Sequence, residues 1–284
     1  MVKCPSCGEF NNRNDSFCGK CGAKLPEPKY CSFCDEKYAE KNYCTKCGSE
    51  LITKEEYDKI NKKIDKLMKH ARRLIEEREF AQAINHCNAA IKIKPTTEIW
   101  YTKGNCLCNL KNFEDGIKCY DESINLNPKN FSSIYFKGRA LFDLQKYDDA
   151  IDCFNELIDL NPNNHLAIIG KANAYAKQEK YETAIMFYNK ALKLKPDDSN
   201  LWNSLGNLYL NTNKFEKGLE CCDKALSINS ENIFAWWTKG EIYFELKEYD
   251  KAMENSLKAK ELNPNNTELL DFIKKIENAQ SNSY

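Results

Sequence analysis

Several features that define other protein classes are missing from this 284-residue sequence. It has no run of about 18 apolar residues, and its amino-terminal MVKCPSC has no apolar h-region, so it predicts neither a membrane span nor a signal peptide. Basic and acidic residues balance at 42 each, which argues against a protein held to nucleic acid mainly by a basic surface. Histidine is scarce, and no phosphate loop or nucleophile–base motif surrounds His70, His86 or His165. The sequence therefore predicts no enzyme.

Cysteine, by contrast, is plentiful and unevenly distributed. Eight of the 15 cysteines fall within the first 47 residues. The other seven have no fixed spacing: Cys87, Cys106, Cys108, Cys119, Cys153, Cys221 and Cys222. Scattered thiols are typical of a reducing compartment rather than of a secreted disulfide scaffold, so we expect a cytoplasmic protein. Cys87, Cys119, Cys153 and Cys222 lie on predicted helices where small apolar residues pack, and core filling is their expected role.

The eight amino-terminal cysteines form four CxxC pairs in two copies of one unit. The first copy runs from Cys4 to Leu25 and the second from Cys31 to Leu51. Two CxxC turns can present four thiolates to one tetrahedral Zn²⁺ ion, and a closed four-sulfur site is structural. Each copy has few apolar residues, so the metal would supply folding free energy, roughly 10–16 kcal/mol. The predicted metal ligands are Cys4, Cys7, Cys18 and Cys21 in the first copy and Cys31, Cys34, Cys44 and Cys47 in the second.

These units resemble the short zinc ribbons found, often doubled, at the amino termini of prokaryotic proteins. Gly8, Gly22 and Gly48 follow the second cysteine of a pair, where a positive φ is expected, whereas Asp35 replaces this glycine in the third pair. We expect one ion per copy, two Zn²⁺ in all, because each copy repeats the whole ligand set. A cross-braced pairing, of the first with the third pair and the second with the fourth, and iron in place of zinc remain alternatives.

From residue 64 onward the sequence repeats itself. Short stretches such as KIKPT, NLNPKN and DLNPNN recur at intervals of 33 and then 34 residues, with Ser230 replacing the proline once. In each repeat, three positions share one stripe of a first helix. They hold an apolar residue, a small residue four positions later and an apolar residue three positions after that. The small residues are Ala71, Gly104, Gly138, Ala172, Gly206 and Gly240. An aromatic residue then opens each second helix: Phe80, Phe113, Tyr147, Tyr181, Phe215 and Tyr249. The small residues are expected where paired helices approach closely, with the aromatic residues filling the space beside them.

A 34-residue period with these positions resembles the tetratricopeptide (TPR) family, and the whole chain resembles archaeal-type prokaryotic TPR proteins with a double zinc ribbon. The resemblance implies an all-α TPR solenoid preceded by two small ribbons. The expected domains are ribbons at 1–27 and 28–52, a connecting helix at 53–63, six repeats in 64–266 and a capping helix at 267–280. The repeats are expected at 64–96, 97–130, 131–164, 165–198, 199–232 and 233–266.

Capping residues mark where the helices begin. Thr53 and Glu56 form a predicted capping box for a helix that starts before the first repeat and joins it rigidly to the ribbons. Asn130, Asn164, Asp198, Asn232 and Asn266 are the expected N-caps of later first helices. Leu269, Phe272, Ile273 and Ile276 give the last helix an apolar face that can cover the final hairpin.

The TPR resemblance also implies a function, the binding of an extended segment of another protein on the face lined by first helices. The groove positions implied are Tyr101, Asn105, Tyr135, Arg139, Asn173, Asn203, Asn207, Trp237 and Glu241. The lysine with which chaperone-tail receptors clamp a terminal carboxylate is absent, because Tyr101, Ile169 and Asn203 stand four residues before the asparagines. We therefore expect a non-enzymatic adaptor, with an unidentified protein partner other than a chaperone tail.

The alternative is a nucleic-acid-associated protein. Zinc ribbons sometimes bind nucleic acid, and the segment 62–73 is basic: Lys62, Lys63, Lys66, Lys69, Arg72 and Arg73 stand against Asp65 alone. Such a run is usually a solvated helix face, so protein binding is the favoured hypothesis.

Overall fold

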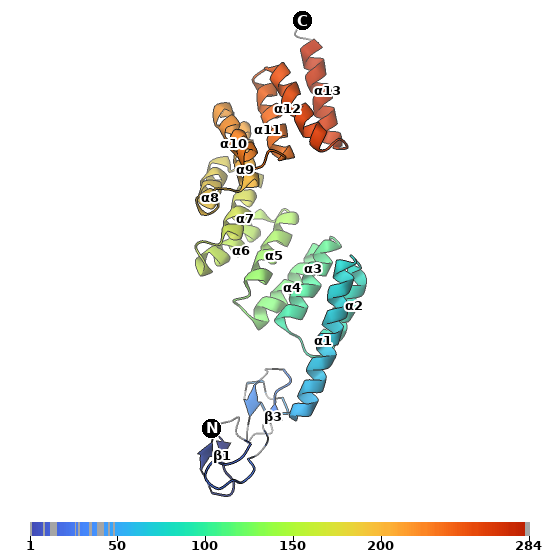
Figure 1. Cartoon of the computed structure of the whole chain (residues 1–284), viewed down its shortest axis with the longest axis vertical. Helices are drawn as coiled ribbons and strands as arrows, with labels where there is room; N and C mark the ends of the chain where they lie inside the picture. The colour runs from blue at the N-terminus through green and yellow to red at the C-terminus, as the bar shows by residue number, and fades with distance from the viewer. Residues whose placement is uncertain are drawn as a thin grey trace. The chain divides into compact units, whose positions relative to one another are not determined.

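The computed structural model describes residues 2–7, 9–11, 16–25, 27, 29–33, 36–38, 43–44, 46–47 and 49–281. The described residues form two small two-stranded sheets followed by thirteen helices (Figure 1). None of the described helices is both long and apolar enough to cross a membrane. The chain divides into two compact units, residues 1–133 and 134–284.

The cysteine-rich segment has two hairpins built on one plan. β1 (Val2–Lys3) pairs antiparallel with β2 (Phe10–Asn11), and β3 (Lys29–Tyr30) pairs antiparallel with β4 (Lys37–Tyr38). At all four CxxC turns the first cysteine donates its backbone N–H to the carbonyl five residues later. These bonds are Cys4 to Glu9 at 2.8 Å, Cys18 to Ala23 at 2.8 Å, Cys31 to Glu36 at 2.9 Å and Cys44 to Ser49 at 2.7 Å. The repeated bond shows that the two copies share one backbone fold.

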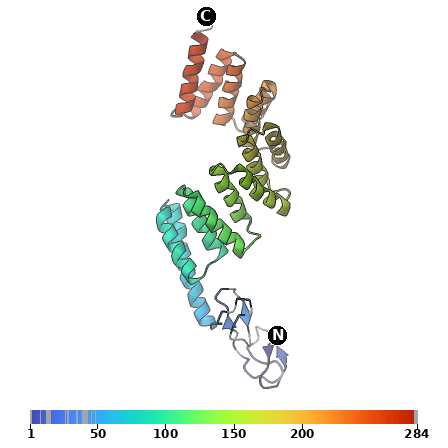
Figure 2. The same ribbon diagram turned by 180° about the vertical axis from the view of Figure 1, so that it is seen from behind.

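The helices alternate between first and second members of antiparallel hairpins. The first helices are α1 (Lys54–Glu76), α3 (Thr97–Asn109), α5 (Phe131–Asp143), α7 (His165–Lys177), α9 (Ser199–Asn211) and α11 (Ile233–Glu245). The second helices are α2 (Phe80–Ile93), α4 (Phe113–Leu126), α6 (Tyr147–Leu160), α8 (Tyr181–Leu194), α10 (Phe215–Ile228) and α12 (Tyr249–Leu262). In the unit of residues 134–284, each second helix also contacts the next first helix, and α13 (Thr267–Ser281) packs on α12 (Figures 1 and 2). The all-α fold of stacked helical hairpins predicted from the sequence is confirmed.

The helices begin at the predicted caps. The Thr53 side chain accepts a hydrogen bond from the Glu56 backbone and the Glu56 side chain reaches back, which completes the capping box of the 23-residue helix α1. The five predicted N-cap residues all accept a hydrogen bond from the backbone N–H three residues later: Asn130, Asn164, Asp198, Asn232 and Asn266. An N-cap of this kind contributes about 1 kcal/mol, so the caps fix the phase of each hairpin.

Close helix packing follows from the small residues. A Cβ atom on Gly104 would lie 2.7 Å from the Tyr120 ring, and one on Gly240 would lie 2.7 Å from Ser256 Oγ. The side chain facing the small residue therefore comes from the middle of the second helix, sixteen positions later, rather than from the aromatic residue that opens that helix. Ala71, Ala172 and their second-helix counterparts Ala83 and Ala184 are fully buried.

The last helix covers the end of the array as predicted. Leu269, Ile273 and Ile276 are buried, and Leu269 and Ile273 pack with Ala259 of α12. Phe272 is half-buried against the Phe244 ring, with 5.6 Å between the ring centroids. A polar outer face on such a helix leaves the terminal hairpin without an exposed apolar side.

One residue in each hairpin turn has a left-handed backbone. These residues are Arg78, Lys111, Gln145, Glu179, Asn213 and Lys247, with φ between 55° and 63°. The turn is a C-terminal cap in which two N–H groups close on the helix end, for example Lys111 on Cys108 and Asn112 on Leu107. A left-handed backbone costs a residue with a Cβ about 1–2 kcal/mol, whereas glycine and asparagine adopt it more easily.

We therefore expect Gln145→Gly to stabilise the chain by about 0.5–1 kcal/mol. Glycine adopts the left-handed backbone without strain, and the Gln145 side chain that is removed is exposed. Urea unfolding of the wild type and the variant measures the difference. Asn213→Gly is the matched control, since asparagine already tolerates this conformation, and its stability should change less. A loss of stability in Gln145→Gly would contradict the strain interpretation.

Candidate functional site

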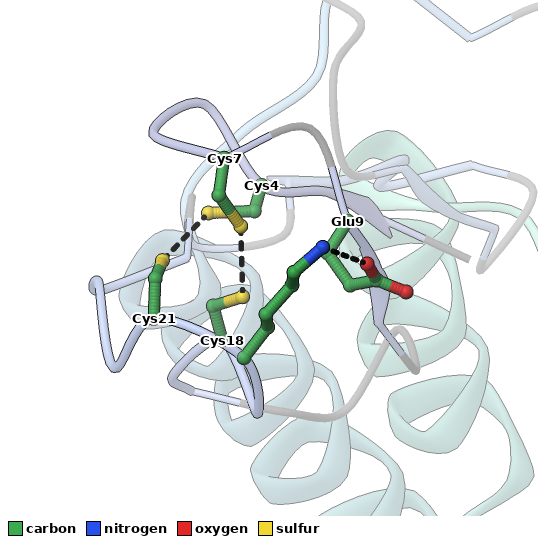
Figure 3. A network of polar contacts seen from close by, with 6 residues as sticks. Cys4, Cys7, Glu9, Cys18 and Cys21 are labelled. Carbon is green, nitrogen blue, oxygen red and sulfur yellow. Dashed lines mark hydrogen bonds and ion pairs between the residues drawn. The ribbon is translucent and has the colours of Figure 1, made fainter.

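Four cysteines of the first copy converge on one point. Cys4 Sγ lies 3.5 Å from Cys21 Sγ, and Cys7 Sγ lies 3.6 Å from Cys18 Sγ (Figure 3). All four sulfurs lie within 4.8 Å of one another, and the four cysteines are free thiols. Cys4 and Cys18 are buried whereas Cys7 and Cys21 are exposed, so the cluster sits at the surface of its hairpin.

This arrangement fits a tetrahedral metal. With metal–sulfur bonds of about 2.3 Å, neighbouring sulfurs of a tetrahedron are separated by about 3.8 Å, close to the observed spacings. The chain passes the cluster with a positive φ of 69° at Gly22, as predicted for the glycine after a CxxC pair. Gly8 and Gly48 lie outside the described residues.

The second copy gathers Cys31, Cys44 and Cys47, whose sulfurs also lie within 4.8 Å of one another. Cys34, the fourth predicted ligand, and Asp35 beside it lie outside the described residues. The Tyr38 hydroxyl is 3.3 Å from Cys44 Sγ, and this hydrogen bond lowers the pKa of the Cys44 thiol to about 6. A thiolate at Cys44 is the form that ligates a metal. Both clusters draw their sulfurs from within one copy, as the expectation of one ion per copy requires.

A second kind of site lies on the first helices of the unit 134–284. A hollow of about 460 Å³ opens there, and three predicted groove residues line it: Asn173 of α7 with Asn203 and Asn207 of α9. Tyr188, Ser204 and Asn211 contribute further polar groups, and Phe142, Tyr181 and Leu208 contribute apolar surface. The hollow combines amides with flat apolar area, a mixture suited to a peptide backbone and its side chains.

Hydrogen bonds inside the unit orient these amides. The Tyr188 hydroxyl donates to Asn173 Oδ1, and Asn211 Nδ2 donates to Asn207 Oδ1 at 3.3 Å. Asn203 Oδ1 is buried and has no hydrogen-bond partner within the described residues. A buried amide oxygen without a partner costs free energy, about 1–3 kcal/mol, and a ligand N–H could recover it only if the Asn203 amide rotated toward the hollow.

The other predicted groove residues of this unit lie elsewhere on their helices. Tyr135 packs 6.1 Å from the Phe154 ring, and burial raises the pKa of its phenol, while Arg139 is exposed. Trp237 packs on the cluster around Ala259, Leu269 and Ile273. Burial raises the pKa of the neighbouring Glu241 carboxyl to about 7, although Trp237 and Lys275 partly offset this. These residues do not line the hollow.

In the unit of residues 1–133, the predicted pair is Tyr101 and Asn105 on α3. Asn105 Oδ1 accepts a hydrogen bond from the Tyr120 hydroxyl at 2.7 Å, and the Tyr101 and Tyr120 rings lie 6.3 Å apart. Tyr120 and Tyr188 occupy the same position of their repeats, so both units hold a groove asparagine in the same way. Neither tyrosine is among the residues predicted from the sequence, although the 68 residues between Tyr120 and Tyr188, two repeat periods, are a signal that marks them as equivalent.

A further hollow of about 560 Å³ lies on α1, in the basic segment. Lys66, Lys69, His70, Arg72, Arg73 and Glu76 line it. Two of its charges are paired, Arg72 with Glu98 at 2.5 Å and Arg73 with Glu77 at 3.6 Å. His70 stacks on His86 with 5.6 Å between the ring centroids, and His86 is half-buried.

Four cysteines outside the clusters are predicted to fill the helical core. Cys87, Cys119, Cys153 and Cys222 are all buried. Burial raises the pKa of the Cys87 and Cys222 thiols to about 12, which keeps them protonated and unreactive.

Comparison with known proteins agrees with the fold. Models of the tetratricopeptide repeat match residues 97–130, 132–164, 199–232 and 235–266, and a TPR-repeat model matches residues 172–213. A comparison with curated proteins finds no match.

Solved structures of similar fold include PilF of Pseudomonas aeruginosa, with a TM-score of 0.62 at 14% identity over 76% of this chain and 99% of that one. The TPR protein TTC0263 of Thermus thermophilus has a TM-score of 0.54 at 17% identity, covering 63% and 98% of the two chains. YrrB, described as a TPR protein with an unusual peptide-binding site, has a TM-score of 0.50 at 19% identity, covering 62% and 91%. At identities this low, the similarity shows only that the proteins share a fold. Because the repeat models together cover more than half of the sequence and the matched residues fold as helical hairpins, the chain is a tetratricopeptide repeat protein.

Proposed function

We propose that this protein is a non-enzymatic adaptor that binds an extended segment of a partner protein on its first helices. The amide-lined hollow of about 460 Å³ on α7 and α9 carries this proposal. Asn173 and Asn207, whose oxygens are already engaged, can offer their amide nitrogens as donors, and rotation of the Asn203 amide would present its buried, unpartnered oxygen as an acceptor. A polypeptide backbone alternates N–H and C=O groups, so it can satisfy both. The TPR fold is typically a scaffold, and YrrB is described as having a peptide-binding site.

Within this proposal, the nine groove residues do not have equal weight. Asn173, Asn203 and Asn207 share the hollow and are the proposed contact residues. Tyr101, Asn105, Tyr135, Arg139, Trp237 and Glu241 are proposed as further contacts of a longer segment.

We also propose that each cysteine cluster binds one structural Zn²⁺ ion, through Cys4, Cys7, Cys18 and Cys21 and through Cys31, Cys34, Cys44 and Cys47. The sulfur spacings of the first cluster support this, as does the equivalent backbone of the second. With four protein ligands the metal would have no open position for a substrate, so its contribution is to hold the hairpins folded.

A second candidate function rests on the basic hollow of α1. Four of its six lining side chains are lysine or arginine, which suits the phosphates of a nucleic acid. The ion pairs of Arg72 and Arg73 reduce the free positive charge, so protein binding is the favoured function.

The adaptor proposal predicts that replacing Asn173, Asn203 and Asn207 together by alanine weakens partner capture, because the ligand backbone would lose its hydrogen bonds. Partners are captured on immobilised protein and quantified by mass spectrometry. Asn163, Asn189 and Asn265, which are exposed and lie off the hollow, provide the matched triple-alanine control and should retain the same partners. Equal loss in both variants, or in neither, would contradict the assignment of the hollow.

The zinc proposal predicts two zinc ions per purified chain by elemental analysis. Cys18→Ser and Cys44→Ser should each lose one ion, because they occupy the same position in the two copies. Cys222→Ser is the control, since that thiol is buried in the helical core and should leave the metal content unchanged. Iron in the purified protein, or a single shared ion, would refute the proposal as stated.

The nucleic-acid alternative predicts a salt-dependent mobility shift of labelled single-stranded RNA that is lost when Lys66, Lys69 and Arg73 become alanine. Replacing three lysines outside the hollow, Lys193, Lys247 and Lys258, should leave the shift intact. The absence of any shift at physiological salt would rule this function out for RNA.

A further inference from the structure

We propose that the second cysteine site acts as a metal-dependent clamp on the open end of the first helical hairpin: with metal bound it holds the amino-terminal extension of α1 in place and keeps Lys94 buried. This inference rests on the proposed zinc binding and goes beyond it, because it assigns the second ion a task outside its own ribbon. All the residues concerned lie in the unit 1–133.

The backbone of the second ribbon is joined directly to the start of α1. Tyr30 and Ile52 exchange two backbone hydrogen bonds, each of 2.9 Å. Cys31, a proposed ligand, follows Tyr30, and Thr53, the N-cap of α1, follows Ile52. The ligand Cys31, the hydrogen-bonded pair Tyr30 and Ile52, and the N-cap Thr53 are thus linked directly through the backbone. A metal bound at Cys31 would therefore fix the position at which α1 begins.

Side chains continue this link toward the end of α2. The Tyr30 ring stacks on the Tyr57 ring of α1, with centroids 5.0 Å apart and planes at 27°. On the side of α2, the Lys94 ammonium lies 5.6 Å from the Tyr57 ring centroid, within the range of a cation–π contact. Tyr57 therefore contacts both Tyr30 of the second ribbon and Lys94 at the end of α2.

Lys94 itself differs from its counterparts in the other repeats. Its exposed fraction is 4%, whereas the residues at the same position one to four repeats later are exposed. These are Asn127, Asn161, Lys195 and Asn229. The first hairpin differs from the others in its first helix, which has 23 residues in α1 against 13 in α3. The additional amino-terminal turns of α1 carry Tyr57, which contacts Lys94, and the clamp assigns the burial of Lys94 to them.

The ribbon cannot hold these turns without its metal. Its described core consists of Cys31, Cys44 and Leu51, with Tyr38 packed against them, and two of these residues are the proposed ligands themselves. So small a core does not offset the entropy of ordering the chain, whereas a bound metal does. Loss of the metal would release Tyr30 from Tyr57, leave the first turns of α1 without support and open Lys94 to solvent.

The test measures how fast an amine-acetylating reagent modifies Lys94 in the full chain, by mass spectrometry, with zinc content determined on the same samples. Cys44→Ser should lose one zinc and acetylate Lys94 several-fold faster than the wild type. Cys18→Ser, the matched variant in the first ribbon, should lose one zinc and leave Lys94 protected, because the contacts described above all come from the second ribbon. Lys195, at the same position of a later repeat, is exposed and should react at one rate in all samples.

A second pair of variants tests the contacts of Tyr57 and leaves the metal site unchanged. Tyr57→Ala should expose Lys94 while both zinc ions stay bound, whereas Tyr57→Phe, which keeps the ring, should preserve the protection. If Cys44→Ser loses its zinc but Lys94 stays protected, or if Tyr57→Ala leaves Lys94 protected, the clamp is refuted while zinc binding stands. If Cys44→Ser loses no zinc, the proposed metal function fails and the clamp fails with it.

Discussion

The close approach of two helices at a small residue is the constraint on which the helical part of this protein depends. At Gly104, Gly138 and Gly170 an added Cβ would lie within 3 Å of an aromatic ring from the paired or neighbouring helix. Contacts that tight leave no room for a larger side chain without displacing a helix. The glycines cost helix propensity, about 1 kcal/mol each, and the packing of the rings they admit offsets that cost.

The same approach positions the proposed binding surface. A tyrosine that passes over the small residue can reach across the hairpin with its hydroxyl, as Tyr120 does to Asn105 and Tyr188 does to Asn173. The phenol thus fills the core with its ring and orients a first-helix amide with its oxygen. Core packing and the proposed ligand recognition are therefore connected through single side chains, and a change in one would be expected to disturb the other.

The two cysteine-rich hairpins are not stabilised by packing of this kind. Their described cores are a few side chains each, Cys4, Cys18 and Leu25 in one and Cys31, Cys44 and Leu51 in the other. The sulfurs are both the core and the proposed ligand set, so the zinc proposal makes folding and metal binding one event. In the proposed clamp, this dependence extends to the first turns of α1 through Tyr30 and Tyr57, whereas the rest of the first helical hairpin and the later repeats have apolar cores.

Local chemistry by itself determined the hairpin phase, the starts of the helices and the membership of the first sulfur cluster. Those features depend on residues close in sequence, such as an N-cap and the N–H three positions later, or two CxxC turns separated by a short loop. Only the tertiary structure decided which of the nine predicted groove residues share one hollow, because convergence depends on the angle between stacked helices. It also decided that Tyr188 holds Asn173 and that Lys94 is buried while Lys195 is exposed. Equivalent positions of a repeat look alike in sequence, and neighbouring elements distant along the chain give each of them a different environment.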